Sequence, residues 1–404
     1  MTVTFGGSDI TSSVNRVITR HGADMRIAEC DVDAPLSLSY PSGYETLHVV
    51  AGLTNYGGGV STFGPSTVRF DGVVINTGVD HWPYTMKPQG RGWLALADVL
   101  RVPDDAWENY ANPFSNPDPL LTPSKYDPPG IDMTLDGLGQ TDSDQINYVL
   151  TQAGLTSHYT LTDIGGLSAL LGTQVKAFEQ FVWRRGQSGL EYIESLDGMF
   201  GFRTTERSDG SIFRRLTSSF APFTDHSLDD DYTLNENRDI LEGARIVRDI
   251  TNVRSRVIVT GWDDGSGSNV WAGVIGASPL PPGVALVSEA FSSPMIEKQQ
   301  ASDPGDGFSC AEAVNYWLGE LQYPMLEAVV STPKDTPYEP FDLIYLNAPH
   351  LLGVNQSMWV KHIEREVTEN SFTQTLTLRA QDFATFRGPP VLPFALATHL
   401  RSGP

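Results

Sequence analysis

Residues 181–203 read FVWRRGQSGLEYIESLDGMFGFR and predict a strand, a turn, a helix and a second strand, in that order. Ser188 stands where the helix N-cap belongs, and Glu191 follows at the spacing of a capping box. The apolar face of this helix is formed by Leu190, Ile193, Leu196 and Phe200. Gly201 then ends the helix, and the chain continues in an extended conformation.

Two features flank this stretch. The turn residues 208–210 predict a hairpin that returns the chain into a strand at 212–216. Upstream, polar residues 141–144 precede an apolar helical pattern that Gly154 closes. The side chains of that pattern are Ile146, Val149, Leu150 and Ala153. Further helical patterns cover 167–177 and 310–321, so the middle of the chain is predicted to mix helices with strands.

Short strands bounded by turn residues are predicted on both sides of this middle region. The N-terminal ones cover 16–19, 36–38, 46–50 and 67–75, and the C-terminal ones cover 245–261, 341–346, 359–367 and 372–378. Side chains alternate along residues 68–74, which is typical of a strand with one buried face. We expect the last two strands to pair as a hairpin across Glu369 and Asn370.

These patterns predict an α+β protein that is mainly β. Its 404 residues exceed what one hydrophobic core normally serves, and 38 Gly and 27 Pro favour many strands and turns. We expect two barrel-like, strand-rich domains with a smaller mixed α/β region between them. The expected ranges are 1–125 for the first, including a Pro-rich excursion at 103–129, 126–244 for the middle, 245–388 for the second, and 389–404 for an extended tail.

The chain is strongly acidic: 27 Lys and Arg stand against 49 Asp and Glu, a formal charge of −22. Such a surface repels phosphate and argues against a basic patch that grips nucleic acid. An acidic surface can still line a passage through which DNA slides without sticking. Solubility, or adaptation of the source organism, is the plainer explanation of the same charge.

Cys30 and Cys310 are too few for a disulfide framework, and we expect both to be buried small side chains. No stretch of about 18 apolar residues occurs, and residues 1–10 lack the pattern of a secretory signal. We therefore expect neither secretion nor stable membrane insertion.

No residue pattern identifies a catalytic, cofactor-binding or metal-binding site, and we predict no cofactor. The histidines at 21, 48, 81, 158, 226, 350, 362 and 399 form no local zinc pair. The acidic runs 229–231 and 263–269 lack the regular ligands of a calcium loop. Ser188 lacks the second glycine of a nucleophile elbow. We expect the tryptophans at 183, 271, 317 and 359 to be core residues rather than sugar platforms.

The segment from Trp183 to Arg203 resembles the central module of tail hub proteins, in which a compact helix precedes a Gly-Phe strand. The late-control D family, the hub of contractile phage baseplates and the base of type VI secretion spikes share this pattern. Residues 67–75 resemble the entry to the first barrel, and 142–154 a small helical insertion of minor tail proteins. Residues 253–261 look like the strand that opens the second barrel, and 359–378 like its closing hairpin.

This resemblance implies a structural virion protein rather than an enzyme: a homotrimeric tail-tip or baseplate hub, assembled in the host cytoplasm. Three copies with two similar barrels each would match a six-fold tail tube to a three-fold tip. The implied partners are a distal tail or tail-tube ring, a tip spike, fibre or tape-measure protein, and passing genomic DNA that is not bound specifically. No lysozyme module, oligosaccharide-binding barrel or repetitive spike follows Phe386, so piercing or digestion would fall to another chain.

Two other classes of protein stay open at this stage. A peptidoglycan- or polysaccharide-cleaving tail enzyme would need a pair of acids in a cleft. A receptor-binding tail protein could use exposed aromatic side chains, for which Trp82 and Tyr84 are the candidates.

Overall fold

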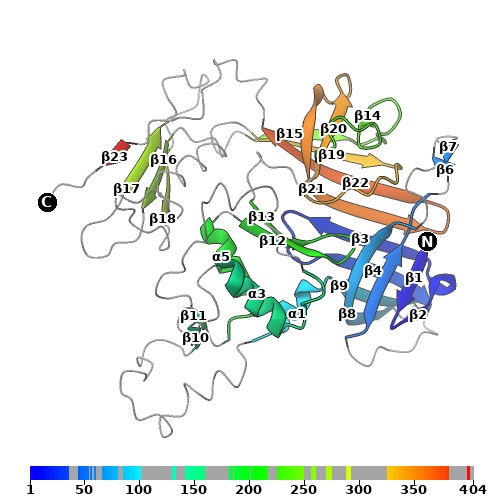
Figure 1. The fold of residues 1–404 in the computed structure, drawn as a ribbon. Coiled ribbons are helices and arrows are strands. Elements are labelled where there is room, and N and C mark those ends of the chain that lie inside the picture. The colour runs from blue at the N-terminus through cyan, green and yellow to red at the C-terminus, as the bar shows by residue number, and fades with distance from the viewer. Residues whose placement is uncertain are drawn as a thin grey trace, which may run out of the picture.

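The computed structural model of the chain places most of its described residues in strands, which confirms the mainly β class (Figure 1). The residues described are 1–35, 44–53, 55–56, 59–60, 66–80, 85–101, 130–132, 142–159, 182–184, 186–200, 202–216, 225–249, 256–260, 270–274, 288–292, 325–381 and 398–400. The predicted features at 36–38, 103–129, 167–177, 263–269, 310–321 and 389–397, with His81, Trp82, Tyr84, Cys310 and Trp317, lie outside these ranges.

Thirteen of the described strands form one sheet. In spatial order, its main path is β15 (Arg245–Asp249), β19 (Met325–Thr332), β22 (Phe372–Gln381), β21 (Val354–Thr368), β3 (Arg16–Gly22), β4 (Glu29–Pro35), β9 (Thr85–Arg91), β8 (Val68–Asp80), β5 (Thr46–Val50), β1 (Thr2–Phe5) and β2 (Ser8–Asp9). A branch adds β20 (Leu343–Ala348), antiparallel to β21, and β14 (Leu234–Asn235), parallel to β20. Within the described residues, the end strands β15 and β2 do not pair with each other, so this sheet does not close into a barrel.

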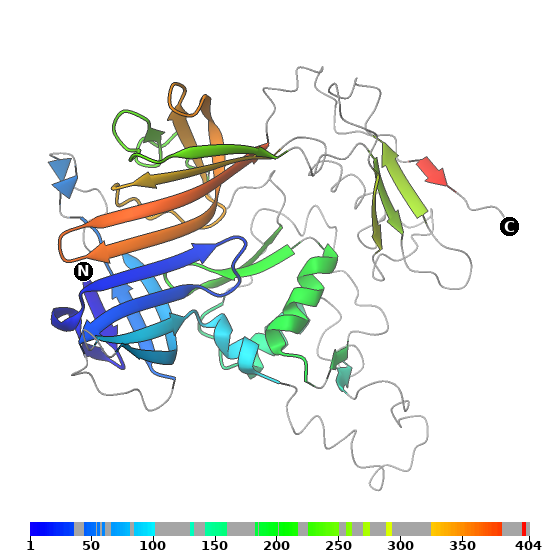
Figure 2. The same ribbon diagram turned by 180° about the vertical axis from the view of Figure 1, so that it is seen from behind.

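Strand β21 joins the two ends of the chain. Along one edge it pairs with β22, which confirms the predicted hairpin. Along its other edge, residues 354–359 pair with β20 and residues 362–368 pair with β3. A bulge between Val360 and His362 lies where the partner changes, and the Lys361 carbonyl there accepts the Ala23 N–H at 2.6 Å. Both ribbon views show β3 beside β21 (Figures 1 and 2).

One face of this sheet carries two apolar cores. In the N-terminal strands, small and branched side chains of β1, β3, β4 and β5 pack with Phe70 of β8. In the C-terminal strands, residues of β19, β20, β21 and β22 pack with Tyr338. Strand β22 alternates as predicted, with Phe372, Gln374, Leu376 and Leu378 buried. The sequence predicted two strand-rich parts; their joining into one sheet was not predicted.

A third core holds the helices. It lies among α1 (Leu94–Val99), α3 (Asp142–Gln152) and α5 (Gly189–Phe200), where Trp183 is fully buried as predicted. Helix α3 ends as expected at Gly154, whose φ is +76°, with hydrogen bonds from the Gly154 N–H to the Thr151 carbonyl and from the Leu155 N–H to the Leu150 carbonyl. A short 3-10 helix, η1, covers Thr11–Ser13. No described helix has the length and apolar composition to cross a bilayer.

The remaining strands form small sheets. Pairs are made by β6 (Asn55–Tyr56) with β7 (Gly59–Val60), by β10 (Gly130–Asp132) with β11 (Val182–Arg184), and by β12 (Phe202–Glu206) with β13 (Ile212–Leu216). A four-stranded sheet runs β18 (Ser288–Ser292), β16 (Arg256–Thr260), β17 (Val270–Val274) and β23 (Thr398–Leu400).

Two details of the sequence interpretation were wrong. Within the predicted strand region 245–261, Arg245–Asp249 and Arg256–Thr260 form two strands, and the second, β16, belongs to the four-stranded sheet rather than to the one containing β19–β22. A short β-branched run favours a strand but does not specify its partner. In β8, both faces are buried: Phe70 and Arg69 are each inaccessible to solvent. The alternation of apolar and polar residues predicted the strand correctly. It could not predict that Arg69 would be buried with hydrogen-bond acceptors around it.

The seam between β21 and β3 yields a stability prediction. Ile363 is fully buried at the seam, and Ile363→Ala should lower the free energy of unfolding by about 2–5 kcal/mol through lost burial and the cavity left behind. Urea denaturation measures this change. The control Thr377→Ala, in the neighbouring strand and half-buried, should cost about 0.5 kcal/mol. Equal costs for the two variants would contradict the seam as a main site of packing.

Candidate functional site at the junction hairpin

The hairpin β12–β13 packs beside helix α5 and contacts residues from both the N-terminal and the C-terminal parts of the chain. In Figure 1 it lies between α5 and β3. We call this hairpin with its connecting turn, residues 202–216, the junction hairpin. Thr205 Oγ1 donates to the Met25 carbonyl at 2.8 Å, and Phe213 packs edge-on against Phe341. The junction hairpin therefore touches the loop that follows β3 and the segment that precedes β20, one in each half of the large sheet.

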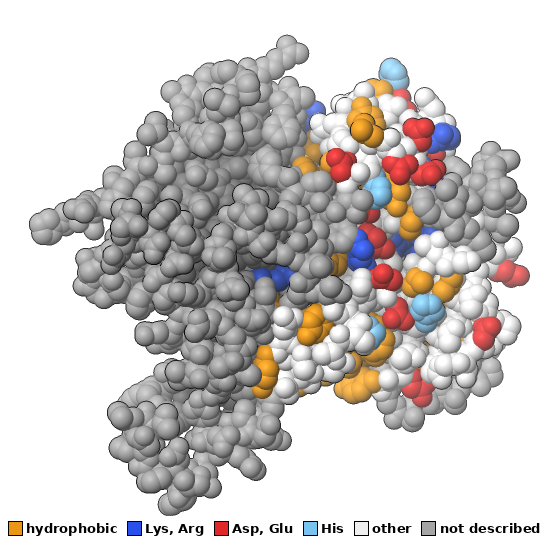
Figure 3. All heavy atoms as spheres, viewed as in Figure 1, with side chains coloured by type: hydrophobic (Ala, Val, Ile, Leu, Met, Phe, Trp, Pro, Cys, Tyr) orange, Lys and Arg blue, Asp and Glu red, His pale blue; other side chains and the backbone are white. Residues whose placement is uncertain are grey.

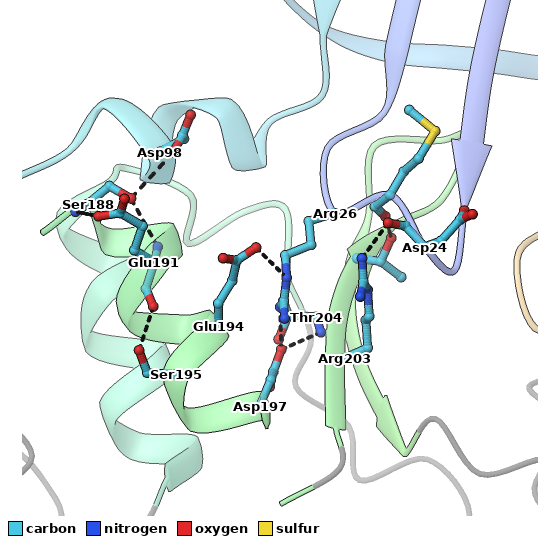
Figure 4. A network of polar contacts seen from close by, with 12 residues as sticks. Asp24, Arg26, Asp98, Ser188, Glu191, Glu194, Ser195, Asp197, Arg203 and Thr204 are labelled. Atoms are coloured by element: carbon cyan, nitrogen blue, oxygen red, sulfur yellow. Dashed lines mark hydrogen bonds and ion pairs between the residues drawn. The ribbon is translucent and has the colours of Figure 1, made fainter. Parts of the chain in front are cut away.

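Helix α5 begins with a capping box, and Ser188 of this capping box also contacts α1 (Figure 4). The Glu191 N–H donates to Ser188 Oγ at 3.0 Å, and the Ser188 N–H donates to Glu191 Oε2 at 2.7 Å. Ser188 Oγ also lies 3.3 Å from Asp98 Oδ1 of α1. The predicted capping role of Ser188 is confirmed, and its hydroxyl is engaged by these groups.

Asp197, near the end of α5, ties this helix to the junction hairpin and to the loop between β3 and β4 (Figure 4). Its side chain is fully buried and accepts from Arg26 Nη1 at 2.7 Å, from Arg214 Nε at 2.8 Å and from the Thr204 N–H at 2.6 Å. Arg26 also contacts Glu194 at 2.6 Å. A buried carboxylate is tolerated only when such charged and N–H donors replace water.

Glu206, at the end of β12, is also buried. Its Oε2 accepts the Ala28 N–H at 2.9 Å and its Oε1 accepts the Leu94 N–H at 2.5 Å, so it joins β12 to the segment before β4 and to the start of α1. Burial raises the pKa of Glu206 to about 7, against the opposing effect of the two N–H donors, while the nearby charge of Asp71 raises it further. A Cβ on Gly92 would lie 1.7 Å from Glu206 Oε2, so this position requires glycine.

At the tip of the junction hairpin, Ser208 connects to the C-terminal strands. The Ser208 N–H donates to Glu339 Oε2 at 3.1 Å, and Arg365 Nη1 of β21 donates to Ser208 Oγ at 3.0 Å. Arg365 is fully buried and also donates to Gln374 Oε1 and to the Tyr338 carbonyl. Burial raises the pKa of Glu339 and lowers that of Arg365, although each charge favours the ionised form of the other.

A second buried arginine lies in the N-terminal strands. Arg69 of β8 donates to the Ala51 carbonyl at 2.8 Å and to the Asp335 carbonyl at 2.6 Å, and its guanidinium stacks over Phe372 at 5.1 Å. Burial lowers its pKa to about 9, and the charge of Arg365 lowers it further. Arg69 thus links β8 with a loop 266 residues away.

The structure brings together few of the polar residues considered from the sequence. His48 contacts Asp71 at 3.0 Å, His158 stacks on Trp93, His226 stacks on Tyr232 and His362 lies 3.5 Å from Asp24. His21 is buried, and burial lowers its pKa well below the usual value. Asp229 Oδ1 accepts a hydrogen bond from the Asp231 N–H within a turn. Among the described residues, no three His, Cys, Asp or Glu side chains gather as they would around a metal ion. Cys30 is buried, as predicted.

The buried charges of Arg69, Asp197, Glu206 and Arg365, and the half-buried Glu339, were not predicted from the sequence. Asp197 ends an otherwise apolar helical face, and Glu206 precedes a turn, where an acid is ordinary. Their partners are far away in the sequence, such as residue 28 for Glu206 and residue 26 for Asp197. Only Arg69, between apolar neighbours in a strand, carried a local signal.

Solved structures with the same fold are phage tail proteins. The 43 kDa tail protein of prophage MuSo2 from Shewanella oneidensis aligns with a TM-score of 0.56 at 12% identity, over 93% of this chain and 97% of that one. A tail protein of Neisseria meningitidis MC58 aligns with a TM-score of 0.56 at 11% identity, over 94% and 96%. Prophage tail protein gp18 from Listeria monocytogenes EGD-e aligns with a TM-score of 0.51 at 10% identity, over 93% of each chain.

The predicted likeness to phage tail proteins is thus confirmed at the level of the fold. The sequence itself matches no protein-family model and no curated protein. At these low identities, shared architecture is what the likeness shows.

Asp197 provides a test of the junction hairpin. Asp197→Asn removes the charge that faces Arg26 and Arg214, and it should lower the free energy of unfolding by about 3–5 kcal/mol in urea denaturation. Glu194→Gln is the matched control, because Glu194 meets the same Arg26 from a half-exposed position; it should cost at most about 1 kcal/mol. A cost below about 1 kcal/mol for Asp197→Asn would show that the buried pairs do not hold α5.

Glu206 makes stability depend on pH. Its folded-state pKa near 7 exceeds the ordinary value of 4.5, so the folded protein binds more protons than the unfolded chain between these values. The resulting contribution of Glu206 to the free energy of unfolding is fully present below about pH 4.5 and is lost as the pH rises through 7. In the wild type, the contribution of Glu206 should make the free energy of unfolding fall between pH 5 and pH 8. Glu206→Gln should make this fall smaller by on the order of 1–3 kcal/mol, as denaturation at the two pH values measures. The exposed control Glu242→Gln should match the wild type; an unchanged pH dependence in Glu206→Gln would contradict the assignment.

Proposed function

We propose that this chain is a structural protein of a phage-type tail, a trimeric hub at the tail tip or baseplate. The observation that carries the proposal is the shared fold with three tail proteins, two of them from prophages, each aligned over more than 90% of both chains. The hub would adapt the six-fold tail tube to a three-fold tip and form part of the channel for DNA ejection.

The seam between β3 and β21 supports this proposal. A hub that presents two similar units to a six-fold tube must hold them in a fixed relation, so that three copies offer six regular positions. Here the N-terminal and C-terminal strands share one hydrogen-bonded sheet, and Arg69 ties the two parts together from the inside. Units joined in this way form a stiff ring segment. We keep 1–125 and 245–388 as the two units and 126–244 as the region between them.

The acids that pack around the junction hairpin favour a structural rather than an enzymatic role. Asp197 faces two arginines, Glu206 accepts two backbone N–H groups, and Glu339 lies beside Arg365. Each carboxylate is occupied by donors of the fold itself, whereas a general acid or nucleophile must face a substrate. In the tail, the partners of this chain would be two further copies of itself, the tail-tube or distal tail ring, a spike, fibre or tape-measure protein, and the passing genome.

The mass and symmetry of the purified chain test this proposal. Light scattering over a range of concentrations should give three times the chain mass, and class averages from electron microscopy should show a three-fold ring with a central hole. A compact monomer at every concentration would contradict the hub. Clearing of cell-wall substrate in zymograms, or specific adsorption to cells, would instead support the enzyme or the receptor-binding protein.

A further inference from the structure

The large sheet has a second face, opposite its apolar cores, that runs without interruption across the seam. We call it the open face: the outward side chains of β19, β22, β21, β3, β4 and β9. One row in register across these strands is Ser331, Thr375, Glu364, Arg20, Glu29 and Arg91. These side chains are half-buried or exposed, whereas their sequence neighbours point into the cores. The open face is therefore a polar wall shared by both halves of the chain.

Acids on neighbouring strands hold the bases of the open face. Arg20 lies 2.7 Å from both Glu364 and Asp31 and 3.9 Å from Glu29. Arg91 lies 2.6 Å from Glu29. These pairs cross from β21 to β3, from β3 to β4 and from β4 to β9, so the charges form a connected network and not isolated contacts.

The same arrangement continues at both ends of the seam. Arg16 lies 2.8 Å from Glu366, and Lys361, at the bulge of β21, lies 3.0 Å from Glu327 and 3.7 Å from Asp24. In these contacts, four bases (Arg16, Arg20, Arg91 and Lys361) meet six acids (Asp24, Glu29, Asp31, Glu327, Glu364 and Glu366). In the coloured part of Figure 3, acidic and basic side chains of the described residues are interspersed.

This chemistry is unsuited to two kinds of tight contact. The centre of a stable protein interface is depleted of charge and rich in aromatic and apolar side chains. A surface that binds DNA presents Lys and Arg that can neutralise phosphates. The open face offers charged pairs in place of an apolar centre, and acids pair with four of its bases, Arg16, Arg20, Arg91 and Lys361. A polyanion beside this network therefore meets four bases that acids already hold, and the further outward bases of these strands are Arg379 of β22 and Lys87 of β9.

We propose that the open face forms the wall of the hub channel that faces double-stranded DNA, and that its acids keep Arg20 and its neighbours from gripping the passing phosphates. This inference rests on the proposed hub function. The wall of a ring with six units must continue from one unit to the next within each chain. The open face does so across the seam between β3 and β21.

Thiol labelling of assembled rings tests where the open face lies. In a Cys310→Ser background, Thr375→Cys places a thiol on the open face, and Leu228→Cys places one on a turn where the native side chain is 99% exposed. Both should react with a biotin maleimide in intact rings, and streptavidin should then bind only the label at 228. Streptavidin binding at 375 would put the open face outside the ring. Failure of the small reagent at 375 would show that another subunit covers it. Either result overturns the proposal.

Charge substitution tests the role of the acids. Asp31→Asn with Glu364→Gln leaves Arg20 with only Glu29, so ring binding to linear duplex DNA in gel shifts should tighten at least about tenfold and weaken again with added salt. Asp230→Asn with Glu242→Gln changes the net charge equally at exposed positions away from this network and should leave DNA binding unchanged. Equal effects of the two double variants, or none, would overturn the proposal. If the wild type forms rings and these tests fail, only the channel wall is wrong; if it forms no rings, the hub itself is wrong.

Discussion

The backbone pairing of β3 with the second half of β21 is the constraint on which the rest of this fold depends. Hydrogen bonds between residues 16–22 and 362–368 make one sheet out of strands from the two ends of the chain. Without that seam, each half would expose a row of unpaired N–H and carbonyl groups. The bulge at Lys361 makes the seam possible, because it lies where β21 exchanges β20 for β3 as its neighbour.

Buried charges then secure the segments that pack around the seam. Three of these charges connect the junction hairpin with distant parts of the chain. Asp197 bonds to Arg26 and to the hairpin, Glu206 of the hairpin accepts the Ala28 N–H, and Arg365 donates to Ser208 of the hairpin turn. Removing water from such charges costs several kcal/mol, which the donors around them offset only when the geometry is correct. A slightly displaced hairpin would leave these charges without partners. The arrangement therefore favours one position of the hairpin over near alternatives.

Local features of this fold could be predicted from the sequence, and long-range ones could not. The capping box at Ser188 and Glu191, the Gly154 stop and the hairpin after Thr368 follow from patterns of a few residues, and all are present. Strand partners were missed because the alternation of β3 and β21 identifies two strands with a buried face but contains nothing about their register with each other. Glu206 and Asp197 look like surface residues until the fold supplies Ala28 and Leu94 beside the first and Arg26 beside the second.

The distance along the chain between the two seam strands also bears on how the protein is made. Arg20 meets Glu364, a separation of 344 residues, so this contact cannot form until residue 364 has left the ribosome. At ordinary rates of synthesis, β3 emerges on the order of tens of seconds before its partner. Such a high contact order makes folding slow, and the early strands spend that interval with an unpaired edge. Folding helpers that shield strand edges during translation would therefore matter more for this chain than for one whose neighbouring strands pair as they appear.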